Sequence, residues 1–124
     1  MVHPYLYVGL NPNTKARIIS NKKMIVNTDM VLKIISEERS ISIEELTSRS
    51  RLRDIVEGRQ LFSYILRERF GYPYAKIGSL LRRNHATILY GNKVHQSNYQ
   101  YDKNYRSLCD RVLKRVNKLF EHEN

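Results

Sequence analysis

Apolar side chains recur at intervals of three and four residues along most of this chain, the period expected for helices that bury one face. The first run predicts a helix over about 28–38, with its N-cap in residues 27–29. A short second helix is expected to follow, capped by Ser42, with Ile43 pointing inward and an end near Ser48. Two helices are therefore predicted before residue 50.

The longest apolar face belongs to a third predicted helix. Asp54 and Glu57 form an Asp-x-x-Glu capping signal, and Gly71 closes the helix after about four turns. Its buried face is expected to hold Leu61, Phe62, Ile65, Leu66 and Phe70. This helix is predicted to be the central core element.

A last helix is predicted to start near Asp102, with a buried stripe formed by Tyr105, Leu108, Val112, Val116, Leu119 and Phe120. Cys109 lies on the same stripe and is expected to be a packed thiol.

Between the third and the last helix, two apolar runs are joined by a tight basic turn. The first run begins after Pro73, which suits the first turn of a helix, and contains Ile77, Leu80 and Leu81. The second contains Ile88, Leu89 and Val94. The residues left facing outward at the junction are Arg82, Arg83, Asn84, His85 and Thr87. This pattern predicts a helix-turn-helix whose second helix begins with groups able to contact phosphates and base edges.

The predicted fold class is therefore all-α, a bundle of about six helices that contains a helix-turn-helix. Residues 1–27 differ from the rest, because Tyr5–Val8 alternates like a short strand and Asn11–Asn13 reads as a turn. They are expected to form a basic arm or a small hairpin. Residues 28–121 form the predicted DNA-binding domain, and 122–124 are a tail.

Charge strengthens the same hypothesis. The formal net charge is +10, and residues 49–95 hold ten basic against three acidic side chains. A polyanion-binding face requires this concentration of charge, although RNA or an anionic membrane would also attract it. No apolar run is long enough to span a bilayer, and the first residues lack the features of a signal peptide. The expected location is the cytoplasm, in association with the nucleoid.

The sequence offers little for catalysis. The single cysteine excludes an internal disulfide, and the four histidines show no metal-ligand spacing with carboxylates or with Cys109. No serine, cysteine or aspartate lies in a recognisable nucleophile motif. We therefore expect no enzyme activity, no metal and no cofactor.

Four segments carry a family resemblance, in matching order and spacing from about Val26 to Phe120. The segment 83–89 (RNHATIL) resembles the Arg-Asp-His-Thr-Thr-Val signature in the C-terminal domain of the bacterial replication initiator DnaA. The segment 49–53 (RSRLR) resembles the basic loop of that family, 58–61 (GRQL) resembles its Pro-Arg-Gln segment, and 77–78 resembles its Ile-Gly pair. The resemblance implies a helix-turn-helix that binds double-stranded DNA.

The resemblance also implies residue roles. Arg51 would enter an AT-rich minor groove, and Arg59 and Gln60 would hold backbone or bases. Arg49 and Arg53 would contact phosphates, with solvated surface charge as the alternative. The residues that would face the major groove are Arg83, Asn84, His85 and Thr87. Arg82, Lys76 and Lys93 are further candidates for backbone contacts, with solubility as their alternative role.

Three departures from the family pattern affect this reading. Asn84 stands where the family has Asp, Ala86 stands where it has the first Thr, and the turn is one residue shorter. An acid suits the amino group of cytosine and an amide suits adenine, so an altered sequence preference is predicted. Asn84 is also the natural N-cap, so satisfying first-turn amides is its expected main role, with base contact left open.

In DnaA an ATPase module comes before this domain. The present chain contains no Gly-x-x-x-x-Gly-Lys-Ser/Thr phosphate loop. The expected role is to occupy DnaA-box-like AT-rich sites and so regulate replication initiation or transcription, alone or with a replication or transcription protein. The alternatives are a protein-interaction adaptor of a replication complex and a non-specific or RNA-directed nucleic-acid binder. A monomer is expected off DNA.

Overall fold

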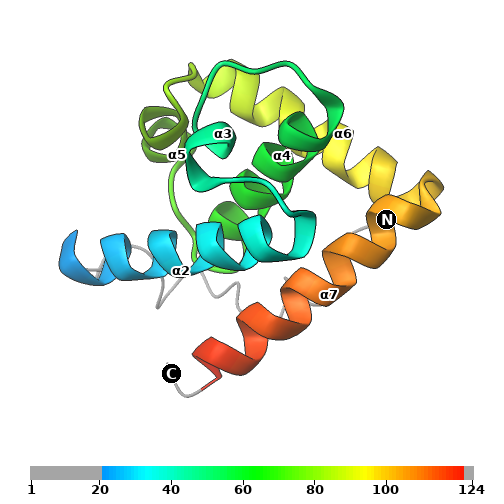
Figure 1. The fold of residues 1–124 in the computed structure, drawn as a ribbon. Coiled ribbons are helices and arrows are strands. Elements are labelled where there is room, and N and C mark those ends of the chain that lie inside the picture. The colour runs from blue at the N-terminus through cyan, green and yellow to red at the C-terminus, as the bar shows by residue number, and fades with distance from the viewer. Residues whose placement is uncertain (1–20, 122–124) are drawn as a thin grey trace.

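The computed structural model describes residues 21–121, and this part of the chain is all-α, as predicted (Figure 1). Its six helices are α2 (Asn21–Arg39), α3 (Ile43–Leu46), α4 (Arg53–Glu68), α5 (Tyr74–Leu81), α6 (His85–Tyr101) and α7 (Lys103–Phe120). The helix-turn-helix is formed by α5 and α6. Residues 1–20 of the predicted arm or hairpin lie outside the described residues, as does the tail over 122–124. Residues 21–27, which were predicted to belong to that arm, are part of α2.

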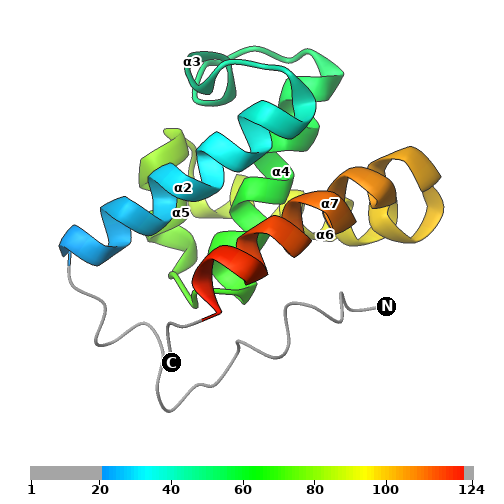
Figure 2. The ribbon, with the colours of Figure 1, turned by 60° about the horizontal axis from the view of Figure 1, so that its bottom comes forward.

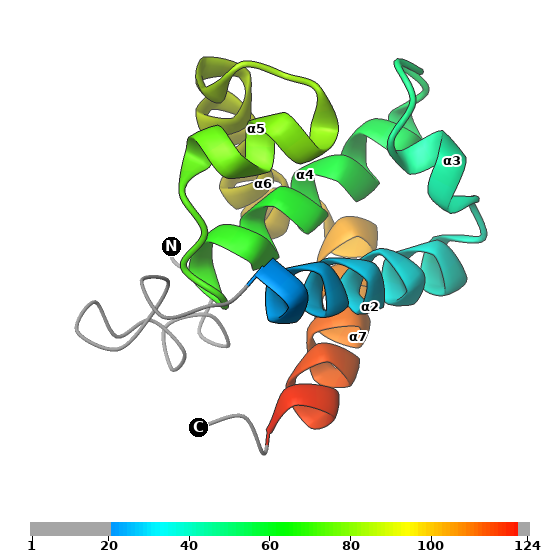
Figure 3. The same ribbon diagram turned by 90° about the vertical axis from the view of Figure 1, so that its left-hand side faces the viewer.

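Helix α4 is the central element that the sequence predicts. It packs against α2, α5, α6 and α7, and it lies between the pair α5 and α6 on one side and the pair α2 and α7 on the other (Figures 2 and 3). All five residues of its expected apolar face are buried: Leu61, Phe62, Ile65, Leu66 and Phe70. Cys109 is also fully buried, as expected, and burial raises the pKa of its thiol to about 12.

The caps of α3 and α7 and the start of α2 test the predicted boundaries. Ser42 caps α3 as predicted and forms a full capping box with Glu45. Helix α7 starts next to Asp102, as predicted, and the Asp102 side chain caps it by accepting the Tyr105 N–H at 3.0 Å. The expected start of the first helix in 27–29 is wrong, because α2 begins at Asn21. Residues 27 and 28 are instead buried within this helix. Local cap chemistry cannot distinguish a real start from a polar residue on a buried helix face.

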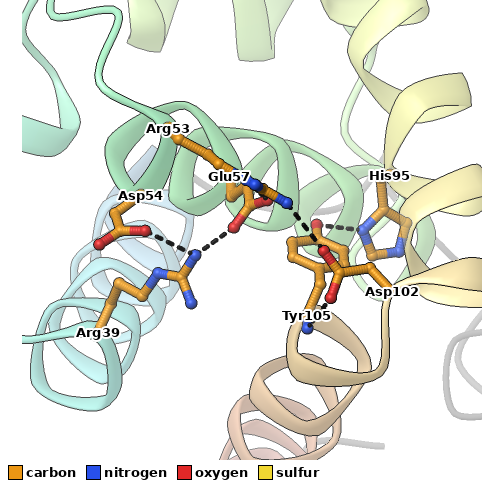
Figure 4. Close-up of polar contacts among 7 residues, drawn as sticks. All are labelled: Arg39, Arg53, Asp54, Glu57, His95, Asp102 and Tyr105. Carbon is orange, nitrogen blue, oxygen red and sulfur yellow. Dashed lines mark hydrogen bonds and ion pairs between the residues drawn. The ribbon is translucent and has the colours of Figure 1, made fainter.

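The predicted Asp-x-x-Glu cap of α4 is also wrong, because Leu52 occupies the N-cap position without a side-chain hydrogen bond. Glu57 is buried and forms ion pairs with Arg39 and with Arg53 (Figure 4). Arg53 also pairs with Asp102 at 3.0 Å. A cluster of charges thus joins α2, α4 and the start of α7, in place of a local cap.

Three apolar residues expected in the core are exposed: Ile43 (39%), Leu89 (40%) and Leu119 (45%). Val94 is only half-buried. The buried face of α6 instead carries Ile88, Gly91, Asn92 and His95, at spacings of three and four. This face lies about 100° from the one that Leu89 marks. The expectation failed because two of the buried residues are polar.

Those two polar residues have buried partners. The Ser63 hydroxyl on α4 donates to the amide oxygen of Asn92 at 3.2 Å. His95 stacks on Tyr64 with ring centroids 3.9 Å apart, and its Nδ1 lies 2.7 Å from the Tyr105 hydroxyl (Figure 4). Hydrogen bonding lets a buried polar side chain replace a leucine at such a position. Helix α6 is thereby anchored to both α4 and α7.

Candidate nucleic-acid interface

The first turn of α6 is presented to solvent by an asparagine cap. The Asn84 amide oxygen accepts the Thr87 N–H at 2.8 Å and the Thr87 hydroxyl at 3.0 Å, as predicted for an N-cap. Asn84, His85, Ala86 and Thr87 are all exposed. The positive end of the helix dipole and the remaining N–H groups of this turn point the same way. This turn is therefore suited to an anionic or hydrogen-bonding partner.

The turn before α6 is held by a close approach of two backbone segments. Arg82 adopts a left-handed conformation (φ 56°, ψ 45°) that ends α5, and the Arg83 N–H donates to the Gly78 carbonyl at 2.8 Å. A Cβ atom at Gly78 would collide with the Arg83 carbonyl oxygen. The Ile-Gly pair of the sequence thus has a structural role, since only glycine leaves room for this turn.

The guanidinium of Arg83 does not face outward, and the expectation that it does is wrong. Its side chain is half-buried and donates to the Leu81 carbonyl at 2.7 Å and to the Ser48 carbonyl at 3.2 Å. The second bond crosses from the helix-turn-helix to the segment between α3 and α4. Arg83 therefore contacts both of the segments in which the sequence predicts DNA contacts.

The basic loop predicted over 49–53 lies, apart from Arg53, in the segment 47–52 that follows α3. Arg49 and Arg51 are exposed, and neither is ion-paired to a residue of the described part of the chain. Two serine side chains shape the loop, because Ser48 Oγ accepts the Ser50 N–H at 3.1 Å and Ser50 Oγ accepts the Leu52 N–H at 3.2 Å. The loop thus presents two arginine side chains from a locally ordered backbone.

Arg53 does not belong to this loop. It is the first residue of α4, and although its side chain is 77% exposed it pairs with Glu57 at 3.1 Å and with Asp102 at 3.0 Å. These two carboxylates raise the pKa of Arg53 and compete for its charge. Of the three arginines in 49–53, Arg53 is thus the one that already forms ion pairs within the protein.

Arg59 is buried on α4, with 8% of its surface exposed. Its Nε donates to the Leu46 carbonyl at 2.9 Å, and its Nη2 donates to the Ser50 carbonyl. Burial, followed by the nearby Arg83 charge, lowers the pKa of Arg59. Gln60 is half-buried beside it, and its amide oxygen has no hydrogen-bond partner among the described residues.

A hollow of about 110 Å³ lies between α4 and α6, beside these groups. Its floor is mainly apolar, and its polar lining comes from Arg59, Gln60, Ser63, Arg83, Thr87 and Tyr90. Tyr90 is 68% exposed and was not among the predicted site residues. It lies four residues after Ala86, so helical spacing from the predicted turn could have found it. Lys93 is exposed farther along the same helix.

The helix-turn-helix and the loop 47–52 carry charge of one sign. No acidic residue occurs between Glu68 and Asp102, a stretch that includes both helices of the helix-turn-helix, or between Glu45 and Asp54, which encloses the basic loop. The exposed cations Arg49, Arg51, Arg82 and Lys93 therefore lie on segments without a carboxylate of their own. Such a surface attracts polyanions over a distance set by salt screening.

Comparison with known proteins identifies the family. The sequence over residues 28–94 matches that of the family described as the bacterial dnaA protein helix-turn-helix. The chain belongs to this family. The match begins within α2 and ends within α6, so it includes the loop 47–52 and the whole helix-turn-helix.

Curated relatives carry the same name. The chromosomal replication initiator protein DnaA of Chloroflexus aggregans is 31% identical over 98 residues, which are 78% of this chain and 20% of that protein. DnaA of Gloeobacter violaceus is 33% identical over 93 residues, and DnaA 2 of Protochlamydia amoebophila is 27% identical over 108. The chain spans about a fifth of the length of these DnaA relatives.

Membership of the DnaA helix-turn-helix family supports DNA binding. No helix in the described part of the chain is long and apolar enough to cross a membrane. Among the same residues, no group of histidine, cysteine and carboxylate side chains is arranged to hold a metal ion.

Proposed function

We propose that this protein binds double-stranded DNA sequence-specifically, at short, asymmetric, AT-rich sites related to those of DnaA, and so regulates replication initiation or transcription. The observation that carries the proposal is the arrangement of the α6 N-terminus and the loop 47–52. Arg83, in the turn before α6, joins them by donating to the Ser48 carbonyl. A recognition helix in the major groove and an arginine loop in the adjacent minor groove would together read a site without two-fold symmetry. A protein monomer would suffice for such a site. Action at these sites requires the compartment that holds the chromosome.

Each exposed residue has a role in this proposal. His85, Ala86 and Thr87 would meet base edges, because they lie on the first turn of α6. Arg51 would enter the minor groove, and Arg49 would contact the adjacent phosphates. Arg82 and Lys93 would contact the backbone on either side of the major groove, and Gln60 would do so from α4. These contacts need neither a cofactor nor a catalytic step.

The cap geometry narrows what Asn84 would recognise. Its amide oxygen is occupied by Thr87, so a bidentate contact with adenine would break the cap. Its amide NH₂ has no partner among the described residues and remains available to donate, which suits an acceptor such as purine N7. An aspartate in the same position would also cap α6, but its second oxygen would accept from the amino group of cytosine.

The double substitution Asn84→Asp with Ala86→Thr is therefore expected to move the preferred site toward that of the family. The first change replaces a donor with an acceptor, and the second adds a hydroxyl and a methyl group beside the bases. Discrimination at the affected base pairs should change by roughly 1–3 kcal/mol each. Competition binding with duplexes that differ at single positions measures this, and a preference unchanged at every position would refute the assignment. Lys114→Ala, an exposed change on α7, is the control.

Selection of bound duplexes from a random library at near-physiological salt tests the proposed function itself. Enrichment of a short asymmetric AT-rich motif would support it. Absence of enrichment would favour the adaptor or the non-specific binder instead. A salt series on the enriched duplex adds a second criterion, because a protein that contacts six or more phosphates should lose roughly 10³-fold in affinity between about 50 and 200 mM salt. RNA of the same sequence should compete weakly.

A further inference from the structure

Two arginines of the candidate interface donate hydrogen bonds to backbone carbonyls of the protein itself. Arg59 donates to the carbonyls of Leu46 and Ser50, and Arg83 donates to those of Ser48 and Leu81. Three of these four carbonyls lie between the end of α3 and the middle of the loop 47–52. The fourth ends α5. We call Arg59 and Arg83 with these carbonyls the arginine clamp.

The clamp satisfies groups that secondary structure leaves unpaired. The last carbonyls of a helix have no partner within that helix, which applies to Leu46 in α3 and to Leu81 in α5. The carbonyls of Ser48 and Ser50 lie in the loop, where no neighbouring strand or helix supplies an N–H donor. A guanidinium presents several donors in one rigid plane, so a single arginine can bridge two carbonyls. A lysine offers no such fixed geometry.

The electrostatics of the clamp have a cost that the carbonyls offset. Arg59 is buried and lies close enough to Arg83 for the second charge to lower the pKa of the first. Neither forms an ion pair with a carboxylate of the described residues. Two like charges are therefore held near each other by carbonyl dipoles alone, and the arrangement fixes the positions of both segments.

We propose that Arg59 and Arg83 are positioning residues. They hold the loop 47–52 against the turn before α6, so that the loop and the first turn of α6 reach DNA as one preformed unit. This inference rests on the proposed function. Arg83 immediately precedes Asn84, the cap of the recognition helix, and its bond to Ser48 spans 35 residues of sequence. Without the clamp, the loop would have to become ordered during binding. The entropy lost in this ordering would reduce the contribution of Arg51 to DNA affinity.

A double-mutant cycle separates positioning from direct contact. Arg51→Ala and Arg83→Ala are each expected to weaken specific binding by roughly tenfold. If Arg83 acts by placing Arg51, the double variant should be no more than about twofold weaker than the weaker single variant. Losses that multiply to roughly 100-fold would overturn the inference, because independent contacts give additive free energies. The control cycle pairs Arg51→Ala with Arg82→Ala, and there the losses should multiply.

Arg82 is a matched control for Arg83. It is the adjacent residue with the same charge, it is exposed, and it makes no side-chain hydrogen bond to the described residues. Arg83→Lys adds a second test, because it keeps the positive charge but removes the planar set of guanidinium donors. A phosphate contact would survive this change, whereas the clamp predicts a loss similar to that of Arg83→Ala. Full affinity in Arg83→Lys would therefore contradict the inference.

A readout without DNA distinguishes this inference from the proposed function. Trypsin cleaves after Arg49 and Arg51, and the clamp should protect these bonds in the free protein. Arg83→Ala and Arg83→Lys should be cleaved there at least severalfold faster than the wild type, and Arg82→Ala should match the wild type. Circular dichroism confirms that the variants retain their helices. Equal cleavage of all four proteins would overturn the clamp even if DNA binding is specific, and faster cleavage would support it even if library selection fails.

Discussion

Two arginine-rich regions of this molecule differ in whether their arginines form ion pairs with carboxylates. On the α2 and α7 side, Arg111 pairs with Glu38 at 3.1 Å, and Arg115 pairs with Glu37 at 2.6 Å and with Glu38 at 2.9 Å. On the α5 and α6 side, the arginines of the loop and of the turn meet carbonyls or solvent and no carboxylate of the described residues. The same residue type thus crosslinks helices in one region and remains available to a polyanion in the other.

This contrast shows where a net charge of +10 can act. A paired arginine brings a nearby negative charge, so it contributes little to the field that a DNA phosphate meets. An unpaired one can displace the cations that surround DNA, and this displacement gives binding its affinity and its salt dependence. The position of the acids is therefore a better guide to a polyanion-binding surface than the position of the bases.

Gly78→Ala should damage the helix-turn-helix most. The added Cβ would collide with the backbone oxygen of Arg83, which cannot rotate away as a flexible side chain could. We expect a loss of about 2 kcal/mol in unfolding free energy and at least tenfold in specific DNA affinity, measured by thermal melting and by titration with duplex.

Gly91→Ala is the matched control on α6. Its added Cβ would lie 3.5 Å from the Gln60 side chain, an ordinary contact, so the gain in helix propensity should stabilise the protein by roughly 0.5–1 kcal/mol. Similar melting temperatures for the two variants would show that the close approach at Gly78 does not constrain the turn.

The same contrast explains which parts of the fold the sequence predicts. Helices α4 and α7 have strong apolar periods, and the core residues predicted for them are all buried except Leu119. Ile55, Tyr64 and Leu113 are also buried and were not predicted. Helix α6 has no such apolar period on its buried face. It buries Asn92 and His95, whose hydrogen bonds depend on residues of α4 and α7. A local pattern cannot include a partner that is distant in sequence.

The candidate site divides in the same way. The exposed residues of the first α6 turn and the loop arginines Arg49 and Arg51 could be located from motif and spacing. The inward direction of Arg59 and Arg83 could not, because an arginine in a basic segment gives no sign of whether its donors meet solvent or backbone carbonyls. Arg53 illustrates this limit most clearly, since its two carboxylate partners are four and 49 residues away.

Arg51→Ala and Arg53→Ala should show how an unpaired and an ion-paired arginine in one short segment differ in their contribution to DNA binding. Arg51 is unpaired among the described residues, so its loss should reduce the slope of log affinity against log salt by roughly one. Arg53 is already paired with Glu57 and Asp102, so its loss should change that slope by less than half as much. Fluorescence anisotropy on one duplex at several salt concentrations measures both. Equal changes in slope would mean that DNA displaces the carboxylates from Arg53.

Arg115→Ala should have the smallest effect, and on stability only. Its pairs with Glu37 and Glu38 are solvent-exposed, so we expect a loss of about 0.5 kcal/mol that shrinks in high salt, with less than a twofold change in DNA affinity. Lys114→Ala removes the same charge from an exposed position of α7 that forms no ion pair with the described residues, and should cost less.

The pH dependence of that effect has a fixed sign. Arg115 and then Arg111 hold the pKa of Glu38 below its ordinary value of 4.5, by hydrogen bonding to the charged form. A carboxylate with a lowered folded-state pKa stabilises the protein above its unfolded pKa, and this contribution is lost as the pH falls through the folded value. The stability difference between Arg115→Ala and the wild type should therefore be constant near neutral pH and should vanish in acid below pH 4.5. A difference that grew in acid would show that these arginines do not act through Glu38, and a large loss of DNA affinity at neutral pH would extend the interface to α7.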